Sequence, residues 1–224
     1  MPSPLFVASH LGITHAVDAI LERGCTEIDM QWMGEGNALY AASGQNHRET
    51  VQLLLDQGAD VNARGGFFGN ALQAASHFGY ETIVDVLLAK GADPHAQCGF
   101  FGNALQAASY RGSETIVDLL LARGVDINVQ GGSHGNALQA ALFGGRIHVV
   151  QTLIARGADV NIKDDNVGKE LVAASLDSRE KILQILAAED ADMTGHEKYP
   201  NALQRALDRG RNRLKEMRSA DVTE

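Results

Sequence analysis

The side chains that could ligate a metal ion or act as nucleophiles include eight histidines and two cysteines. The histidines are scattered, and no two share a helix face with a carboxylate at metal-ligand spacing. Cys25 and Cys98 stand in unrelated local sequences outside any CxxC or Cys/His cluster, which indicates reduced thiols. The glycine clusters lack a preceding strand and a following Gly-Lys-Ser/Thr, so they are not phosphate loops. We therefore expect no catalytic residue, no metal and no cofactor, and an enzyme is the weakest hypothesis.

Aromatic side chains offer a different chemistry, which is molecular recognition. GGFFGNALQAAS fills residues 65–76, and CGFFGNALQAAS fills residues 98–109, which lie 33 positions later. Both copies set two adjacent phenylalanines in a glycine-rich stretch that ought to face water. Aromatic side chains and arginine dominate the energetics of protein interfaces, so these rings are candidates for contact with a partner.

The spacing of the Asn-Ala-Leu core indicates a repeat of 33 residues. The asparagine recurs at Asn37, Asn70, Asn103 and Asn136. A blurred copy begins at Lys169, and another full copy begins at Asn201. Residues 7–12 also match the repeat at residues 74–79, provided that the first unit contains one additional residue. The spacing of the glycines predicts that this residue lies in the first connecting loop, around Gln31–Glu35.

One unit, residues 70–102, predicts a helix, a turn, a second helix and a long loop. Asn70 is an N-cap for a short alanine-rich helix, and Gly79 ends that helix. The second helix carries one apolar stripe, made of Ile83, Val84, Leu87 and Leu88. Neither helix could bury its apolar face alone, so the units must stack into an elongated solenoid.

This unit resembles the ankyrin repeat. The resemblance rests on GADVNA at 58–63, GADVNI at 157–162, their variants at 91–96 and 124–129, and the helices containing IVDVLL and IVDLLL. It covers nearly all of residues 5–215. The variant GGxxGNALQAAS is similar to the ankyrin arrays of filamentous fungi, notably those attached to NACHT/STAND-type signalling ATPases. The resemblance implies an all-α ankyrin-repeat solenoid of about six repeats with a C-terminal capping helix.

We expect one ankyrin-repeat domain over residues 1–218. Its units are expected near residues 1–36, 37–69, 70–102, 103–135, 136–168 and 169–200. A basic cap helix follows at 201–218, and residues 219–224 are expected to form a disordered tail. The chain opens directly on a first helix without a polar capping unit. We therefore expect either that it is part of a longer protein, fused to other domains, or that something else covers this end.

The loop between units departs from the family pattern. The family's Asp-x-x-Gly turn is replaced, with the Asp position taken by Gly65, Cys98 or Gly131 and the Gly position by Phe68, Phe101 or His134. We therefore expect a finger-shaped turn in which other glycines adopt left-handed angles. The family's Thr-Pro-Leu-His is replaced by Asn-Ala-Leu-Gln or Asn-Ala-Leu-Tyr. Gln73 and Gln139 are expected to make the hydrogen bonds of the missing histidine.

The resemblance implies that partners bind the concave surface made by the finger tips and by the residues that end the first helices. The candidate partner-binding residues are Trp32, Phe67, Phe68, His77, Phe78, Phe100, Phe101, Tyr110, Arg111, His134 and Phe143. Phe68 and Phe101 take the turn position and either stack between neighbouring fingers or face the partner. If the Phe pair had only a structural role, we would expect it in the next unit as well, but Ser133 and His134 stand there instead.

We therefore expect a protein-interaction module within a larger signalling or scaffold protein. The alternative is self-association into a homo-oligomer that hides the aromatic strip. The net charge of −9 argues against a nucleic-acid partner and against an anionic membrane surface. No apolar run approaches the ~18 residues of a membrane span, and no signal peptide is evident. We expect a cytoplasmic protein, with the nucleus as the alternative because the last helix is basic.

Overall fold

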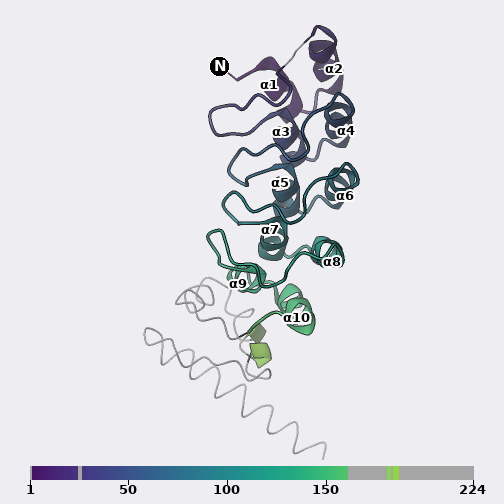
Figure 1. Cartoon of the computed structure of the whole chain (residues 1–224). Helices are drawn as coiled ribbons and strands as arrows, with labels where there is room; N and C mark the ends of the chain where they lie inside the picture. The colour runs from purple at the N-terminus through teal and green to yellow at the C-terminus, as the bar shows by residue number, and fades with distance from the viewer. Residues whose placement is uncertain (1, 25–26, 161–180, 183, 187–224) are drawn as a thin grey trace, which may run out of the picture.

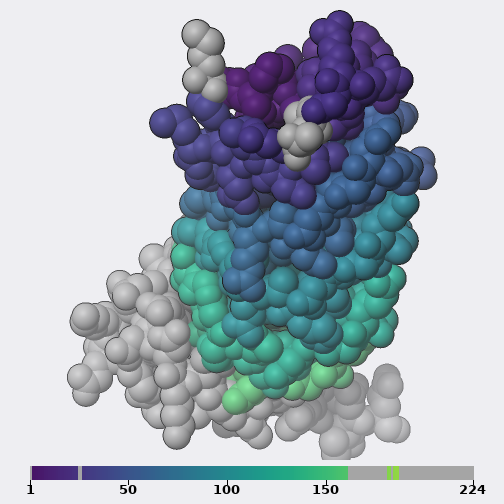
Figure 2. All heavy atoms as spheres, turned by 45° about the horizontal axis from the view of Figure 1, so that its top comes forward, coloured from purple at the N-terminus to yellow at the C-terminus, as the bar shows by residue number. Residues whose placement is uncertain are grey.

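The computed structural model of the chain describes residues 2–24, 27–160, 181–182 and 184–186, and these residues form a solenoid of stacked helix pairs (Figure 1). The inner helices, which lie beside the long loops that we call fingers, are α1 (Pro4–His10), α3 (Ala38–Gly44), α5 (Ala71–Phe78), α7 (Ala104–Arg111) and α9 (Ala137–Phe143). The outer helices are α2 (Thr14–Glu22), α4 (Arg48–Asp56), α6 (Glu81–Ala89), α8 (Glu114–Ala122) and α10 (Ile147–Ala155). Figure 2 shows successive units as consecutive bands along one axis. The described residues contain helices and no strand, so the all-α fold is confirmed.

The inner helices from α3 onward begin at the asparagines of the repeat, which confirms the predicted N-caps. In all four units the asparagine side-chain oxygen accepts a hydrogen bond from the backbone N–H three residues later, at 2.8 to 2.9 Å. Gln106 and Gln139 return the bond, because each side-chain oxygen accepts from the N–H of its capping asparagine. Such a cap stabilises a helix by about 1 kcal/mol. Gly79 ends α5 with a φ of 78°, also as predicted.

The core is built from small side chains on the inner helices and branched ones on the outer helices. Ala74 and Ala75 of α5 are fully buried, and these small residues let neighbouring inner helices approach closely. The predicted stripe of α6 is buried as well: Ile83, Val84 and Leu87 have no exposed surface. Burying each such aliphatic side chain contributes about 1.5 to 3 kcal/mol. Because each helix pair covers the next, the stack is stabilised only as a whole.

Buried glutamines of two inner helices fasten each helix to the finger that ends the same unit. The amide nitrogen of Gln106 donates to the carbonyl oxygens of Gly131 and Gly135 in the next finger, at 3.1 and 2.6 Å. Gln73 makes the equivalent bond to the finger that follows it, at 3.0 Å. Both glutamines are 1% exposed, so these bonds are shielded from water. The hydrogen-bonding role predicted for Gln73 is thereby confirmed.

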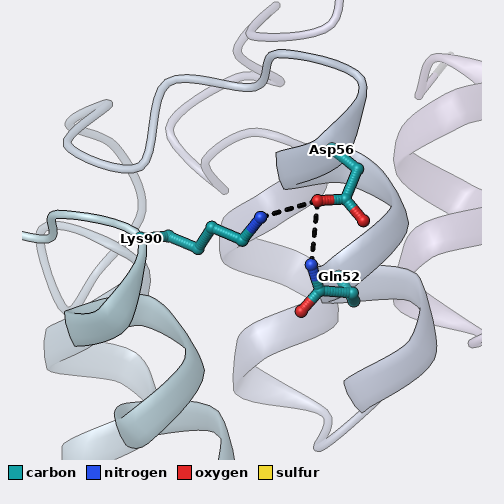
Figure 3. A network of polar contacts seen from close by, with 3 residues as sticks. All are labelled: Gln52, Asp56 and Lys90. Carbon is teal, nitrogen blue, oxygen red and sulfur yellow. Dashed lines mark hydrogen bonds and ion pairs between the residues drawn. The ribbon is translucent and has the colours of Figure 1, made fainter.

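Charged side chains on the outer helices also bridge neighbouring units, but in water. Lys90 contacts the carboxylate of Asp56 at 2.7 Å, and Gln52 donates to the same oxygen at 2.9 Å (Figure 3). Arg156 contacts Asp118 at 2.8 Å two units later. The hydrogen bond from Lys90 lowers the pKa of Asp56 below its usual value. Exposed pairs of this kind add little stability, so the buried contacts decide how the units stack.

The position expected for the additional residue of the first unit, around Gln31–Glu35, is wrong. The Asp29 carboxylate accepts a hydrogen bond from the N–H of Asp60 at 3.1 Å, just as Asn62 accepts one from the N–H of Asp93 at 2.8 Å. These pairs keep the 33-residue interval, so the chain is in register from Asp29 onward. Because α2 and α4 begin 34 residues apart, at positions 14 and 48, the additional residue lies between α2 and Asp29. The spacing of the glycines shows only that the additional residue lies between two glycines. The hydrogen bonds between units are needed to place it more closely.

Several predictions concern the C-terminal third of the chain. Most of the expected unit 169–200, the whole cap helix 201–218 and the tail 219–224 lie outside the described residues. None of the helices in the described part of the chain combines the length and the apolar character needed to cross a lipid bilayer.

Replacing Gln106 by alanine is expected to lower the free energy of unfolding by about 2 to 4 kcal/mol, because this 1% exposed side chain holds two finger carbonyls and caps the N–H of Asn103. The matched control is Gln97→Ala, which changes an exposed glutamine of the neighbouring finger and is expected to cost about 0.5 kcal/mol or less. Chemical denaturation followed by circular dichroism compares the two. Equal losses would mean that the buried glutamines do not hold the fingers.

Candidate functional site

The fingers fold back through a short turn in which glycines adopt left-handed angles, as expected. In the second finger the N–H of Gly65 donates to the carbonyl of Gly69 at 2.8 Å, and Gly66 and Gly69 adopt left-handed φ values of 74° and 104°. The first finger closes in the same way, from the N–H of Trp32 to the carbonyl of Gly36 at 2.9 Å. Trp32 therefore occupies the place that Gly65 takes one unit later, at the start of the turn.

Neighbouring finger tips are joined by backbone hydrogen bonds. The N–H of Phe100 donates to the carbonyl of Phe67 at 3.0 Å, and the N–H of Ser133 donates to the carbonyl of Phe100 at 2.8 Å. Gly99 makes this approach possible, because a side chain there would overlap the Phe68 carbonyl. The finger tips thus form a continuous edge rather than independent loops.

The aromatic side chains of these fingers and of the inner-helix ends pack into one continuous array. We call it the aromatic ladder, and it consists of Phe67, Phe68, His77, Phe78, Phe100, Phe101, Tyr110, His134 and Phe143. The imidazole of His77 lies between the rings of Phe68 and Phe101, with centroid distances of 4.4 and 4.8 Å. Offset contacts of this kind contribute about 0.5 to 1.5 kcal/mol each beyond area burial. Phe101 is 3% exposed, so it packs within the ladder.

His134 continues the ladder where the phenylalanine pair ends. Its imidazole is 8% exposed and lies 5.6 Å from the ring of Phe101, 5.4 Å from Tyr110 and 4.5 Å from Phe143. The expectation that a structural aromatic pair would persist as phenylalanine is therefore wrong for this position, because a neutral imidazole fills the same place. At the neighbouring tip position, Ser133 carries no ring.

The other candidate residues lie on the accessible side of the ladder. Phe67 is its most exposed large apolar side chain, with 59% of its surface accessible, and its ring stacks on Phe100 at 4.7 Å. Arg111 is exposed at the end of α7. The half-buried members are Trp32, Phe68, His77, Phe78, Phe100, Tyr110 and Phe143. The structure thus brings the candidate residues together on one side of the stack, with Phe101 and His134 buried beneath the others.

An open hollow of about 580 Å³ lies at the N-terminal end of the ladder. Its lining includes Trp32, Phe67, Phe68 and Phe78, all of which were candidates, and also Phe6, Glu35 and Tyr40, which were missed. The Tyr40 hydroxyl accepts a hydrogen bond from the N–H of Phe68 at 3.2 Å. Tyr40 stands 33 positions before Gln73, so the repeat register could have identified it as the residue that contacts the next finger.

Burial sets the charge state of the ladder. Burial, and secondarily the positive charge of Arg111, lowers the pKa of His77 to about 4. Burial also lowers the pKa of His134. Both imidazoles are therefore neutral near pH 7 and behave as flat polar rings. The described residues contain no group of three His, Cys, Asp or Glu side chains that could hold a metal ion.

Comparison with protein families gives two matches. Residues 70–164 match the family model described as "Ankyrin repeats (3 copies)", and residues 38–88 match the one described as "Ankyrin repeats (many copies)". The crystal structure of the human ASB11 ankyrin repeat domain is similar, with a TM-score of 0.76 over 93% of this chain and 98% of that chain. The two sequences are 24% identical, so this likeness concerns the fold.

Two curated proteins are similar over shorter stretches. "Azaphilone pigments biosynthesis cluster protein L" of Monascus ruber is 43% identical over 65 residues, which are 26% of this chain and 14% of that protein. Alpha-latrocrustotoxin-Lt1a of Latrodectus tredecimguttatus is 32% identical over 62 residues, which are 28% of this chain and 4% of the toxin. The matched region therefore spans only a small part of either relative.

Acid is expected to destabilise the stack through the ladder histidines. An unfolded histidine binds its proton near pH 6.5, whereas folded His77 resists protonation down to about pH 4. Below pH 6.5 the unfolded state therefore binds more protons, and the free energy of unfolding falls as pH falls through this window. In the variant His77→Phe with His134→Phe this contribution is absent. Denaturant titrations at pH 7 and pH 4 should show a loss larger by about 1 to 3 kcal/mol in the wild type. If the wild type and the variant lost the same unfolding free energy between pH 7 and pH 4, the lowered pKa of His77 would not be the cause of the acid sensitivity.

Proposed function

Because the chain belongs to the ankyrin repeat family, we propose that it is a protein-interaction module that seats its partner on the accessible side of the aromatic ladder. The ankyrin repeat fold is typically a non-catalytic binding module, and catalysis is not part of the proposal. The observation that carries it is Phe67, a large apolar side chain that is 59% exposed at the edge of a packed aromatic array. Aromatic side chains so placed are the usual anchors of protein interfaces.

The ladder contains buried residues that position the fingers and accessible residues that contact the partner. Phe101 and His134 are buried and hold neighbouring fingers at a fixed spacing. Phe67, Phe100 and Tyr110 present ring surface above them. Because backbone hydrogen bonds already order the fingers, binding costs little conformational entropy. A preformed surface of this kind supports a binding role.

The wider context of the module is part of the same proposal. The similar protein of Monascus ruber is fungal and matches over only 14% of its length. We place the chain within a larger cytoplasmic signalling or scaffold protein of a filamentous fungus, fused to other domains such as a NACHT-type ATPase. Full-length transcript sequencing of the source locus tests this arrangement.

The test replaces the accessible rings by residues that the chain itself uses at equivalent positions. Phe67→Ser and Phe100→Ser copy Ser133, and Phe78→Gln copies Gln45. The triple variant is expected to fold like the wild type but to lose partner binding by about tenfold or more, because several interface anchors are removed. Quantitative mass spectrometry of proteins captured by each version from a source-cell extract measures the loss.

The control for this experiment carries three changes on the outer helices. Glu81→Ser, Asp85→Ser and Glu114→Ser alter exposed side chains away from the fingers, so the control should capture the same partner as the wild type. Thermal melting verifies that all three proteins are folded. If the folded triple variant captures the same proteins as the wild type, the aromatic ladder is not the binding surface.

Self-association is the second candidate, favoured by exposed apolar side chains on the first helix pair. Val7, Leu11 and Ile13 are 37%, 58% and 37% exposed. Ala41 and Ala74, the equivalents of Val7 in the next two units, are 5% and 0% exposed. Burial of such surface against a second copy would be favourable.

On this candidate, sedimentation velocity should detect a dimer whose fraction rises with concentration. Leu11→Gln, which copies Gln45 of the second unit, should weaken that dimer by about threefold or more because a large apolar contact is lost. A wild-type sedimentation coefficient that stays constant up to high concentration removes this candidate and leaves the partner-binding proposal intact.

A further inference from the structure

The hollow at the N-terminal end of the ladder lies where two rows of the ladder have no preceding ring. Phe68, Phe101 and His134 form one row of the ladder at 33-residue spacing, and the preceding member of that row is Glu35. The row of His77, Tyr110 and Phe143 is preceded in the same way by Gly44. Both Glu35 and Gly44 line the hollow. The space therefore corresponds to one missing ring pair, with a carboxylate at its edge.

The walls of this space are aromatic. Phe68 lines the hollow and stacks on Tyr40 at a centroid distance of 6.5 Å, while Phe78 meets Phe68 edge to face at 5.3 Å. Phe6, Trp32 and Phe67 also belong to the aromatic part of the lining. Aromatic faces attract cations through the negative potential of the ring, with tryptophan the strongest of the three types.

The charge in the hollow is negative. Among the described residues that line it, Glu35 is the only carboxylate and none is a lysine or arginine, while His10 contributes an imidazole. Glu35 is close enough to the phenol of Tyr40 to contribute to the raised pKa of that group, after the larger effect of burial. The chain as a whole carries a net charge of −9. A cationic occupant is therefore complementary to both the local and the overall charge.

We propose that the hollow binds an arginine side chain of the partner protein, with the guanidinium stacked on the ladder in place of the missing ring pair and hydrogen-bonded to the Glu35 carboxylate. A guanidinium is planar, stacks on aromatic faces and pairs with a carboxylate through two parallel hydrogen bonds. Lysine suits the site less well, because its ammonium is compact and strongly hydrated. This inference rests on the proposed protein-binding function and identifies one anchor of the partner.

The experiment uses the single tryptophan of the chain as its reporter. In ¹⁵N-labelled full-length protein the indole N–H of Trp32 gives one signal, which is followed while blocked peptides are added at pH 8. The peptides are Gly-Gly-Arg-Gly-Gly and its versions with lysine or neutral citrulline in place of arginine. The arginine peptide is expected to shift the signal saturably and to bind at least about fivefold more tightly than the other two. Equal binding of citrulline or lysine overturns the proposal, and so does the absence of any saturable shift.

Two variants test the residues. Glu35→Gln keeps the size of the side chain and removes its charge, so arginine binding should weaken by about fivefold or more. Gly44→Phe copies Phe143 and should fill the hollow and abolish binding. A Cβ at Gly44 meets only ordinary contacts, the nearest atom lying 3.8 Å away in Phe78, so the helix accepts the change. Glu22→Gln, which changes an exposed acid outside the hollow, is the matched control and should bind like the wild type.

The outcomes separate this inference from the proposed function. If arginine binding is absent while the triple variant at Phe67, Phe78 and Phe100 still loses its captured partner, the arginine site is wrong and the interaction module stands. If Glu35→Gln and Gly44→Phe, both folded by thermal melting, bind the arginine peptide as the wild type does, the peptide binds elsewhere and the proposal is also wrong.

Discussion

The stack depends on one buried interaction, the hydrogen bond from a glutamine of an inner helix to the finger that ends the same unit. A finger is a long glycine-rich loop whose backbone N–H and C=O groups need hydrogen-bond partners, and burial of its rings does not supply these partners. Gln73 and Gln106 supply donors in places shielded from water, where an unpaired carbonyl would be costly. Once the fingers are fixed, the rings that they carry have defined positions. The aromatic ladder is therefore a consequence of polar contacts beneath it.

The ladder joins stability and recognition in the same side chains. Phe101 and His134 are buried and space the fingers, while Phe67 presents its ring to solvent. A ring that faces water is normally a liability for a soluble protein. Here each accessible ring lies on a supported one, so its position is fixed before a partner arrives. A phenylalanine at the tip is not required to join neighbouring fingers. Ser133 takes the tip position one unit later, and its N–H still donates to the carbonyl of Phe100.

The sequence predicts the features whose causes are local. The asparagine caps, the glycine that ends α5 and the apolar stripe of α6 each depend on residues within one unit, and all three are confirmed. The features that were missed depend on contacts between units. The additional residue of the first unit was misplaced because the register there is shown by a bond between units, from the N–H of Asp60 to the carboxylate of Asp29. The continuation of the ladder by His134 requires knowing which rings of three different units meet.

The two identical stretches around the Phe pairs give the module an evolutionary property. Residues 70–102 begin at a capping asparagine and end at the glycine before the next one, so a tandem duplication of this segment would preserve every cap, glutamine bond and finger contact. Such a duplication would lengthen the array by one ring pair and leave the hollow beside Glu35 untouched. The length of the aromatic surface and the chemistry of the hollow thus depend on different units. Evolution can change the length of the surface without changing the hollow.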